Sequence, residues 1–341
     1  RLVQTTKSVG KQQTAAHERT DDFSRFRRGM NVAPKVAGLV SRTSLLVLRD
    51  IVRDSRKLVV LTGAGLSTES GIPDYRSPGR PPYRPVQHQE FLSTAAVRQR
   101  YWARSFVGWH IYSKFKPNSA HFALADLENA GRLYHIITQN VDGMHQRAGS
   151  ASWRVTELHG HLRTVDCLSC GTNTSRQQLQ ERLHQLNKDW PPDHSSGSTD
   201  RLVQLLRPDG DVELSPQHIS SFTVAPCDAC GGVLKPSVVF FGGSLHPSIR
   251  AEAATRVEEA DALLVLGSSL ATFSSFVLAK RAAERSIPIG IVNIGPTRAD
   301  TLASVKVEGL LGEVVPALVA FSSDMNIDIP TTGLTTSESV L

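Results

Sequence analysis

The four cysteines of the chain form two matched pairs. Cys167 and Cys170 are separated by two residues, and Cys227 and Cys230 repeat that spacing after 56 intervening residues. Each pair is followed by glycine, which permits a tight turn, and two such turns can place four thiolates around one tetrahedral zinc ion. Four thiolates leave no open coordination position, so we predict one structural zinc per chain. The alternative is four reduced cysteines without a metal.

A second candidate is the glycine-rich turn at residues 63–65 (GAG), which follows a short apolar run at residues 57–62. Backbone amides in such a turn can lie close against a pyrophosphate at the start of a helix. The third glycine of the dinucleotide-binding pattern is missing here. The turn alone is therefore equally typical of an ordinary strand-to-helix connection.

Apolar runs of strand length recur along the chain and alternate with helical patterns. The runs lie at residues 57–62, 133–138, 260–267, 287–294 and 304–307. Asn118 can cap a helix over residues 119–130, and Gly131 follows the end of that helix. Strands alternating with helices predict an α/β fold with a parallel sheet.

Two regions interrupt this alternation. Residues 159–232 contain the cysteines and a polar stretch at residues 191–200 that has loop composition. Residues 76–116 contain proline, arginine and many aromatic residues, with helical spacing from about Val97. We expect the Ser- and Thr-rich residues 322–341 to form a polar tail.

The positive net charge of the chain, +6, originates near its N-terminus. Residues 1–57 contain 13 Lys and Arg against 5 Asp and Glu, whereas the remaining residues contain 25 against 27. We therefore expect no nucleic-acid partner for the folded part. No apolar run approaches the length of a membrane span. The basic leader, residues 1–38, resembles the remains of a mitochondrial transit segment, or else is a disordered leader.

Further motifs surround these candidates in a fixed order. They are residues 71–77 (GIPDYRS), 138–142 (TQNVD), 157–160 (ELHG), 235–242 (KPSVVFFG), 267–270 (GSSL) and 293–295 (NIG). Together with the cysteine pairs, they resemble the sirtuin family over residues 40–320. The likeness is greatest to the mitochondrial class II branch, of the sirtuin four type, on residues 73–77, 98–109 and 293–298.

The resemblance implies a fold and a reaction. The fold would be a Rossmann-type NAD-binding domain (residues 39–158 and 233–321), a smaller zinc-binding domain (159–232) and an inserted helical module (76–116). NAD would bind between the two domains, with zinc structural. The acyl oxygen of an acylated lysine attacks the nicotinamide ribose, nicotinamide leaves, and the acyl group is transferred to ADP-ribose. The partners would be acylated lysines of mitochondrial proteins, and the location the mitochondrial matrix.

The resemblance also implies roles for individual residues. His159 would be the base that deprotonates a ribose hydroxyl, a role that suits the near-neutral pKa of histidine. Asn140 and Asp142 would orient the ribose and nicotinamide side. The cofactor-binding residues would be Gly63, Ala64, Gly65, Ser67, Asp74, Tyr75, Arg76, Gln139, Asn140, Asp142, Gly267, Ser268, Ser269, Asn293, Gly295 and Leu311. The edge that pairs with the substrate backbone would be Val238, Val239, Phe240 and Phe241.

Each assignment has a structural alternative. His159 could be a packed core histidine, Asp142 could cap the helix after its strand, and residues 238–241 could be ordinary core. The stretch at residues 187–213 is longer than in known relatives. It is either a loop near the acyl channel or a surface insertion.

Tyr101 and Arg104 lie three residues apart and hence on one face of the expected helix. In the sirtuin branch that removes succinyl and malonyl groups, a similar pair grips the acyl carboxylate. The resemblance therefore predicts a preference for acyl groups that end in a carboxylate. Alternatively, Arg104 is a surface charge and Tyr101 simply packs.

The resemblance therefore implies that the chain is an NAD-dependent protein-lysine deacylase. One alternative is a protein ADP-ribosyltransferase, and another is a catalytically silent zinc- and NAD-binding interaction module. A hydride-transferring dehydrogenase would have no role for the four thiolates or for His159.

Overall fold

The computed structural model describes residues 41–76, 84–190 and 206–323. The basic leader, the polar stretch at residues 191–200 and residues 324–341 of the expected tail lie outside these ranges. Within them, no helix is both long enough and apolar enough to cross a bilayer.

The larger sheet is parallel throughout and has the strand order β3-β2-β1-β7-β8-β9. Its strands are β1 (Leu58–Thr62), β2 (His135–Thr138), β3 (Val155–Glu157), β7 (Ala262–Leu266), β8 (Ile289–Val292) and β9 (Val305–Val307). All five predicted apolar runs are confirmed as strands of one parallel sheet. The sequence did not predict β3, because three residues are too few to show a pattern.

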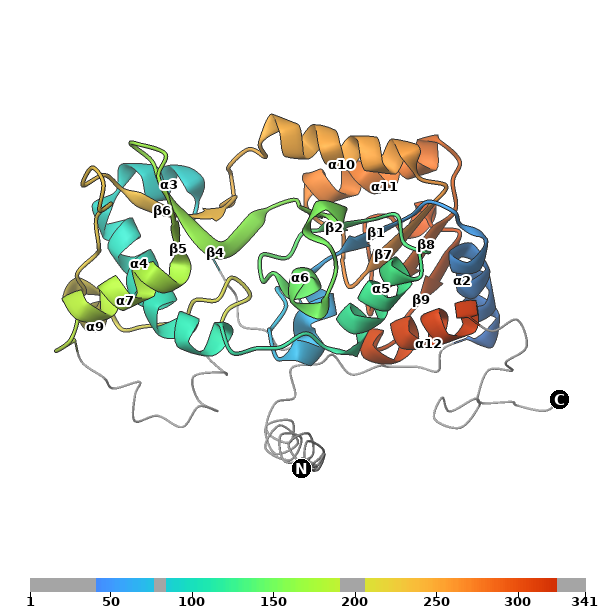
Figure 1. Cartoon of the computed structure of the whole chain (residues 1–341), viewed down its shortest axis with the longest axis horizontal. Coiled ribbons are helices and arrows are strands. Elements are labelled where there is room, and N and C mark those ends of the chain that lie inside the picture. Colours follow the sequence, from blue (N-terminus) through green and yellow to red (C-terminus); the bar gives the residue numbers. More distant parts are fainter. Residues whose placement is uncertain (1–40, 77–83, 191–205, 324–341) are drawn as a thin grey trace, which may run out of the picture. The chain divides into compact units, whose positions relative to one another are not determined.

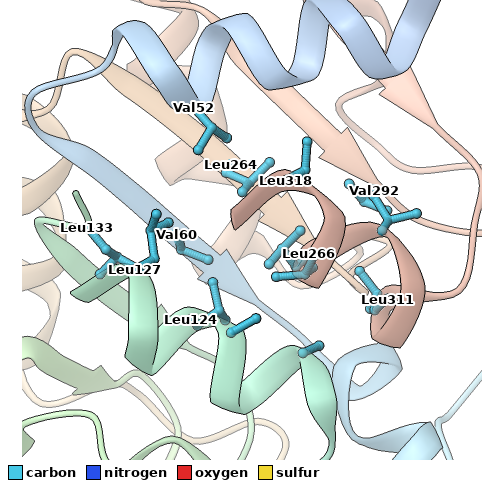
Figure 2. Close-up of a cluster of buried hydrophobic side chains, with 14 of the residues drawn as sticks. Val52, Val60, Leu124, Leu127, Leu133, Leu264, Leu266, Val292, Leu311 and Leu318 are labelled. Carbon is cyan, nitrogen blue, oxygen red and sulfur yellow. The ribbon is translucent and has the colours of Figure 1, made fainter. Parts of the chain in front are cut away.

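Helices cover both faces of this sheet (Figure 1). One face packs against α2 (Arg42–Asp54), α5 (Ser119–Asn129) and α12 (Leu311–Ser323), and the other packs against α10 (Pro247–Glu259) and α11 (Phe273–Glu284). In β1, Leu58 and Val60 enter the first core, part of which is drawn in Figure 2, while Val59 and Leu61 enter the second. Burial on both faces explains why the strand is a continuous apolar run.

Helix α5 begins where the sequence predicts. The side chain of Asn118 accepts hydrogen bonds from the amides of Ala120 and His121, and the ring of His121 completes a capping box. The side-chain amide of Asn118 also donates to the carbonyl oxygen of Leu66 at 2.7 Å. The cap therefore joins the start of α5 to the segment that follows β1.

A smaller antiparallel sheet has the order β5-β4-β6. Its strands are β4 (Gly160–Cys167), β5 (Asn173–Ser175) and β6 (Leu234–Val238), and the helices α7 (Arg176–Leu186) and α9 (Pro216–Ser220) lie within the same stretch of chain. The sequence analysis assigned residues 233–321 to the Rossmann-type domain, but β6 pairs with β4 in the smaller sheet. The strand with which an isolated apolar run pairs depends on tertiary contacts, and the sequence of the run alone does not reveal it.

The helical module packs against this smaller sheet. It consists of α3 (His88–Ser93) and α4 (Ala95–Tyr112), and α4 agrees with the helical spacing expected from Val97. Trp102 is buried and donates from its indole nitrogen to the carbonyl oxygen of Leu234 at 3.2 Å. The guanidinium of Arg176 lies over the rings of Trp102 and Trp109, 5.6 and 4.7 Å from their centroids. These contacts hold the module where its aromatic residues can line a cavity.

Candidate active site and metal centre

The strand order reverses between β1 and β7, which are neighbours in the larger sheet but far apart in sequence. Ligands of open parallel sheets bind at the carboxyl ends of strands at such a switch point. The backbone amide of Gly65 donates to the carbonyl oxygen of Gly267 at 2.9 Å. A Cβ atom on Gly65 would lie 2.8 Å from Cα of Gly267, and one on Gly63 would lie 2.7 Å from Cβ of Ser268. Glycine is therefore required for the two turns to approach so closely.

We expect Gly65→Ala to weaken NAD binding, because the new methyl group would push the β1 and β7 turns apart. Overpacking of this kind destabilises a protein by about 1–3 kcal/mol. The matched control is Gly131→Ala, which adds strain at a positive φ of 70° but has no atom within 4 Å of its Cβ. Isothermal titration with NAD should show lower affinity for Gly65→Ala and unchanged affinity for Gly131→Ala. Equal NAD affinities in both variants would contradict a role in NAD binding for the close turn at Gly63 and Gly65, which we call the glycine cradle.

A cavity of about 1220 Å³ opens at this switch point and extends to the smaller sheet. Nearly all the residues predicted for NAD or substrate line it. They are Gly63, Ala64, Gly65, Ser67, Asp74, Tyr75, Arg76, Tyr101, Gln139, Asn140, Asp142, His159, Val238, Val239, Phe240, Phe241, Gly267, Ser268, Ser269, Asn293 and Gly295. Residues from eight separate segments thus converge on one space large enough for a dinucleotide and an acyl chain.

Two predicted site residues lie outside this lining. Leu311 is 5% exposed and its side chain belongs to the core beneath α12, so its assignment to the cofactor stays a prediction that the side chain does not support. Arg104 is also buried, and its guanidinium forms ion pairs of 3.1 Å with both Asp211 and Glu213. Because two protein carboxylates already engage this side chain, the predicted grip of Arg104 on an acyl carboxylate stays a prediction.

A polar group of residues forms part of the cavity wall after β2. The side-chain amide of Asn140 donates to the carbonyl oxygen of Gly63 at 3.0 Å and to the hydroxyl of Ser67 at 3.1 Å. The hydroxyl of Ser67 donates in turn to Asp142 at 2.7 Å, and Asp142 also accepts from the amide of Met144 at the start of α6 (Met144–Ala148). Asp142 therefore both supports the helix after its strand, as its alternative predicted, and faces the cavity.

His159 lies just before β4 and is held by a hydrogen bond on each ring nitrogen. Nδ1 lies 3.1 Å from the carbonyl oxygen of Gln139, and Nε2 lies 3.1 Å from Oγ of Ser274. Burial lowers the pKa of His159 below its usual value, and the hydrogen bond to the carbonyl of Gln139 opposes this change. The imidazole is therefore neutral at pH 7 and keeps a lone pair available for a proton.

The side chain of Gln139 connects the segment after β2 to β1 and to the turn after β7. Its amide nitrogen donates to the hydroxyl of Ser268 at 2.8 Å and to the carbonyl oxygen of Thr62 at 3.2 Å. On the opposite side of the switch point, the guanidinium of Arg76 donates to the hydroxyl of Ser269 at 3.3 Å. The turn after β7 is thus joined by hydrogen bonds to segments that follow β1 and β2.

The predicted substrate edge continues from β6, which is an edge strand of the smaller sheet. The amide of Val239 donates to the carbonyl oxygen of His159 at 2.9 Å, so the edge is tied to the histidine. Phe240 is buried against Tyr101, with ring centroids 5.2 Å apart, whereas Phe241 is 42% exposed. An edge strand offers unpaired backbone groups to an extended peptide.

The sequence analysis missed several cavity residues. Ser274 and Thr272 lie at the start of α11, and Pro208 and Asp209 belong to the stretch that the sequence marked as long. In its described part, this stretch therefore contributes to the cavity wall, and its place beside an acyl channel stays a prediction. The hydroxyl-rich run after the 267–270 motif was the available signal for Ser274 and Thr272.

The four cysteines come together as predicted. Their sulfur atoms all lie within 4.8 Å of one another, with Cys167 and Cys230 3.5 Å apart and Cys170 and Cys227 3.8 Å apart. Hydrogen bonds from the hydroxyl and the backbone of Thr172 lower the pKa of Cys170 to about 6, which favours the thiolate that metals bind. These positions fit a closed tetrahedral zinc site.

Comparison with known proteins agrees with this geometry. The sequence model of the Sir2 family matches residues 63–274. A protein from Bos taurus named NAD-dependent protein lipoamidase sirtuin-4, mitochondrial, is 48% identical over 276 residues, which cover 80% of this chain and 84% of the relative. A Monosiga brevicollis protein named NAD-dependent protein deacylase SIR4 is 51% identical over 296 residues, 86% of this chain and 94% of the relative.

Solved structures give the same result. A Sir2–p53 peptide–NAD⁺ complex is similar with a TM-score of 0.63 and 30% identity, covering 81% of this chain and 98% of that one. A structure described under the mechanism and regulation of Sir2 enzymes has a TM-score of 0.64 at 30% identity and covers 83% of this chain and 99% of its own. From the shared fold, the sequence identity and the four-cysteine centre, this chain belongs to the Sir2 family, the sirtuins.

Proposed function

We propose that this sirtuin removes acyl groups from protein lysines with NAD as co-substrate, giving nicotinamide and O-acyl-ADP-ribose. The observation that carries the proposal is the position of a neutral histidine, His159, in the same cavity as the glycine cradle at Gly63 and Gly65. The sirtuin relatives are named deacylases, a deacetylase and lipoamidases. Their names do not favour the ADP-ribosyltransferase alternative.

Bound NAD supplies the ribose carbon that accepts the acyl oxygen once nicotinamide leaves. The protein orients the reactants and manages one proton. The pyrophosphate would lie against the turns at Gly65 and Gly267, where the lack of side chains leaves the backbone open to close approach. His159 accepts the proton of a ribose hydroxyl at Nε2, since Nδ1 is committed to the carbonyl oxygen of Gln139. Asn140 and Asp142 present an amide and a carboxylate on the nicotinamide side.

The zinc ion would be held by Cys167, Cys170, Cys227 and Cys230. A closed four-sulfur site offers no position to a substrate, so its contribution is to fold the smaller domain. The first pair ends β4, and the second precedes β6. The zinc ion would thereby join β4, which follows His159, to β6, which precedes the end of the substrate edge.

We propose that the acyl group enters an apolar part of the cavity. Tyr101, Tyr112 and Leu162 line it, and a Cβ on Gly210 would lie 3.0 Å from the ring of Tyr112 and 3.4 Å from Leu162. The same loop contributes the carboxylate of Asp209 to the lining. An apolar wall beside a carboxylate favours a neutral, extended acyl chain over one that ends in a carboxylate. Two relatives are named lipoamidases, which fits this preference.

A panel of acyl-lysine peptides with NAD tests this proposal. We expect lipoyl- or octanoyl-lysine to be cleaved with higher kcat/KM than succinyl- or glutaryl-lysine of the same peptide sequence. Nicotinamide release and the mass of the freed peptide measure the rates. A preference for the acidic acyl groups would contradict the proposed acyl pocket.

Arg104→Met should mainly reduce stability. Removing one partner of a buried ion pair typically costs about 3–5 kcal/mol, and the side chain of Asp211 is 2% exposed. We expect a lower melting temperature and equal relative losses on neutral and acidic acyl peptides. An activity loss confined to the acidic acyl peptides would show instead that Arg104 contacts the acyl carboxylate. Arg98→Met is the control on the same helix, since Arg98 donates to the carbonyl oxygens of Phe91 and Leu92 at the end of α3.

We further propose that the protein acts in the mitochondrial matrix. Two relatives, from Bos taurus and Homo sapiens, are named mitochondrial, and residues 1–57 contain the basic excess of this chain. Protease protection of the protein in isolated mitochondria and in mitoplasts would test the compartment. Digestion in mitoplasts would contradict a matrix location.

A further inference from the structure

A hydroxyl group contacts the atom of His159 that must accept a proton. Oγ of Ser274 lies 3.1 Å from Nε2 of the imidazole, across a sequence separation of 115 residues. Ser274 is the second residue of α11, and its side chain lines the cavity. The contact therefore joins the start of α11 to the histidine inside the site.

The direction of this hydrogen bond follows from the other side of the ring. The carbonyl oxygen of Gln139 can only accept, so Nδ1 of the neutral imidazole must carry its proton. Nε2 then has only a lone pair, and the hydroxyl of Ser274 must be the donor. Donation into that lone pair stabilises the neutral ring, because a protonated Nε2 could not accept it.

Ser274 has a second acceptor within reach. Its Oγ lies 3.4 Å from Oγ1 of Thr272, and Oγ1 of Thr272 lies 3.4 Å from the side-chain carbonyl oxygen of Gln139. Gln139 thus holds the imidazole directly through its backbone and indirectly through Thr272 and Ser274. Because each hydroxyl carries one hydrogen, Ser274 donates either to Nε2 or to Thr272, while the backbone carbonyl of Gln139 fixes the tautomer of His159.

Charged groups do not explain the state of this histidine. Among the described residues, burial and the hydrogen bond to Gln139 are what alter the pKa of His159. Several charged side chains on the elements around it have other partners: Asp142 contacts Ser67, Glu157 pairs with Arg163, Lys235 donates to the carbonyls of Pro236 and Val238, and Glu258 pairs with Arg281. Arg76 and Arg250 line the same cavity, and neither is among the causes that alter the pKa of His159. Burial is the largest influence on the pKa of His159, and the contacts of its two ring nitrogens are the part of the environment that a single substitution can change.

We propose that Ser274 is a positioning residue for His159: its hydroxyl holds the lone pair of Nε2 until a ribose hydroxyl of NAD takes that place. Rotation of the hydroxyl hydrogen from Nε2 to Thr272 releases the lone pair. The ribose O–H bond then breaks as the Nε2–H bond forms, and Oγ of Ser274 can accept from the new imidazolium. The inference rests on the proposed role of His159 as the base.

The test compares Ser274→Ala with Ser274→Thr, which keeps the hydroxyl. The matched control is Ser248→Ala, because Ser248 is also the second residue of its helix and also contacts a histidine, His246, at 2.7 Å. Ser248 lies outside the cavity lining. NMR titration of His159, assigned by difference against His159→Tyr, reports protonation without turnover, and kcat/KM is measured between pH 5.5 and 9.

In Ser274→Ala, we expect the titration of His159 and the acidic limb of kcat/KM to move together to higher pH. A hydrogen bond worth about 1 kcal/mol corresponds to a displacement of roughly half to one pH unit. The ratio of activity at pH 6 to that at pH 8 should fall about three- to tenfold, while Ser274→Thr and Ser248→Ala should resemble the original protein.

Two results would overturn the inference. One is an unchanged titration of His159 in Ser274→Ala, and the other is an activity loss of equal size at every pH that Ser274→Thr does not rescue. Failure of the underlying function is distinguishable, because it would appear as full activity in His159→Tyr. If His159→Tyr is inactive and Ser274→Ala leaves the titration unchanged, only the role of Ser274 is refuted.

Discussion

Replacing His159 with tyrosine is expected to lower kcat by about two to four orders of magnitude, the usual cost of losing a general base. A phenol has its pKa near 10, so it does not provide a proton acceptor at neutral pH. NAD affinity and melting temperature should change little, because the glycine cradle and the cores lie on other segments. Stopped-time assays of nicotinamide release with the best acyl peptide measure the loss.

The control for this substitution is His184→Tyr, since His184 is exposed on α7 and contributes no lining to the cavity. Full turnover in His184→Tyr and near-complete loss in His159→Tyr would support the assignment of the base. Near-normal nicotinamide release by His159→Tyr would show that another group removes the proton.

Loss of zinc should have the second large effect. Cys167→Ser removes a thiolate at the end of β4, where the sulfur is buried against its three partners. Structural zinc sites contribute on the order of 10 kcal/mol to the folding of small domains. We expect less than stoichiometric zinc, a lower melting temperature, and weaker substrate peptide binding, because β6 and the substrate edge follow the second cysteine pair.

Zinc content by elemental analysis and thermal denaturation with and without a chelator test this prediction. Acid should release the metal, because protons compete for the thiolates. A Cys167→Ser protein that melts at the original temperature, or an original protein without stoichiometric zinc, would contradict a structural metal site.

Much of the fold was predictable because its signals are local. The buried strands are continuous apolar runs, and the cap of α5 is a single asparagine. The spacing of the two cysteine pairs likewise predicts that four sulfur atoms surround one point. The partners of isolated groups were not predictable in this way. Arg104 pairs with Asp211 across 107 positions, and its spacing from Tyr101 gave no sign of that carboxylate.

The same distinction applies to the active site. Family motifs located the residues after β1, β2 and β7, since those motifs follow strands whose ends must meet. Ser274 belongs to no such motif, and only the position of the start of α11 at the cavity brings its hydroxyl to His159. The side chain of Leu311 enters the core, which its sequence neighbours did not reveal.

The reaction products test the central claim most directly. The purified chain is incubated with NAD and a lipoyl-lysine peptide, and all products are quantified by mass spectrometry. We predict one nicotinamide and one O-lipoyl-ADP-ribose for every lysine set free, with no product in His159→Tyr. Free lipoic acid without nicotinamide, or ADP-ribose attached to protein in place of a freed lysine, would contradict NAD-dependent deacylation by this chain.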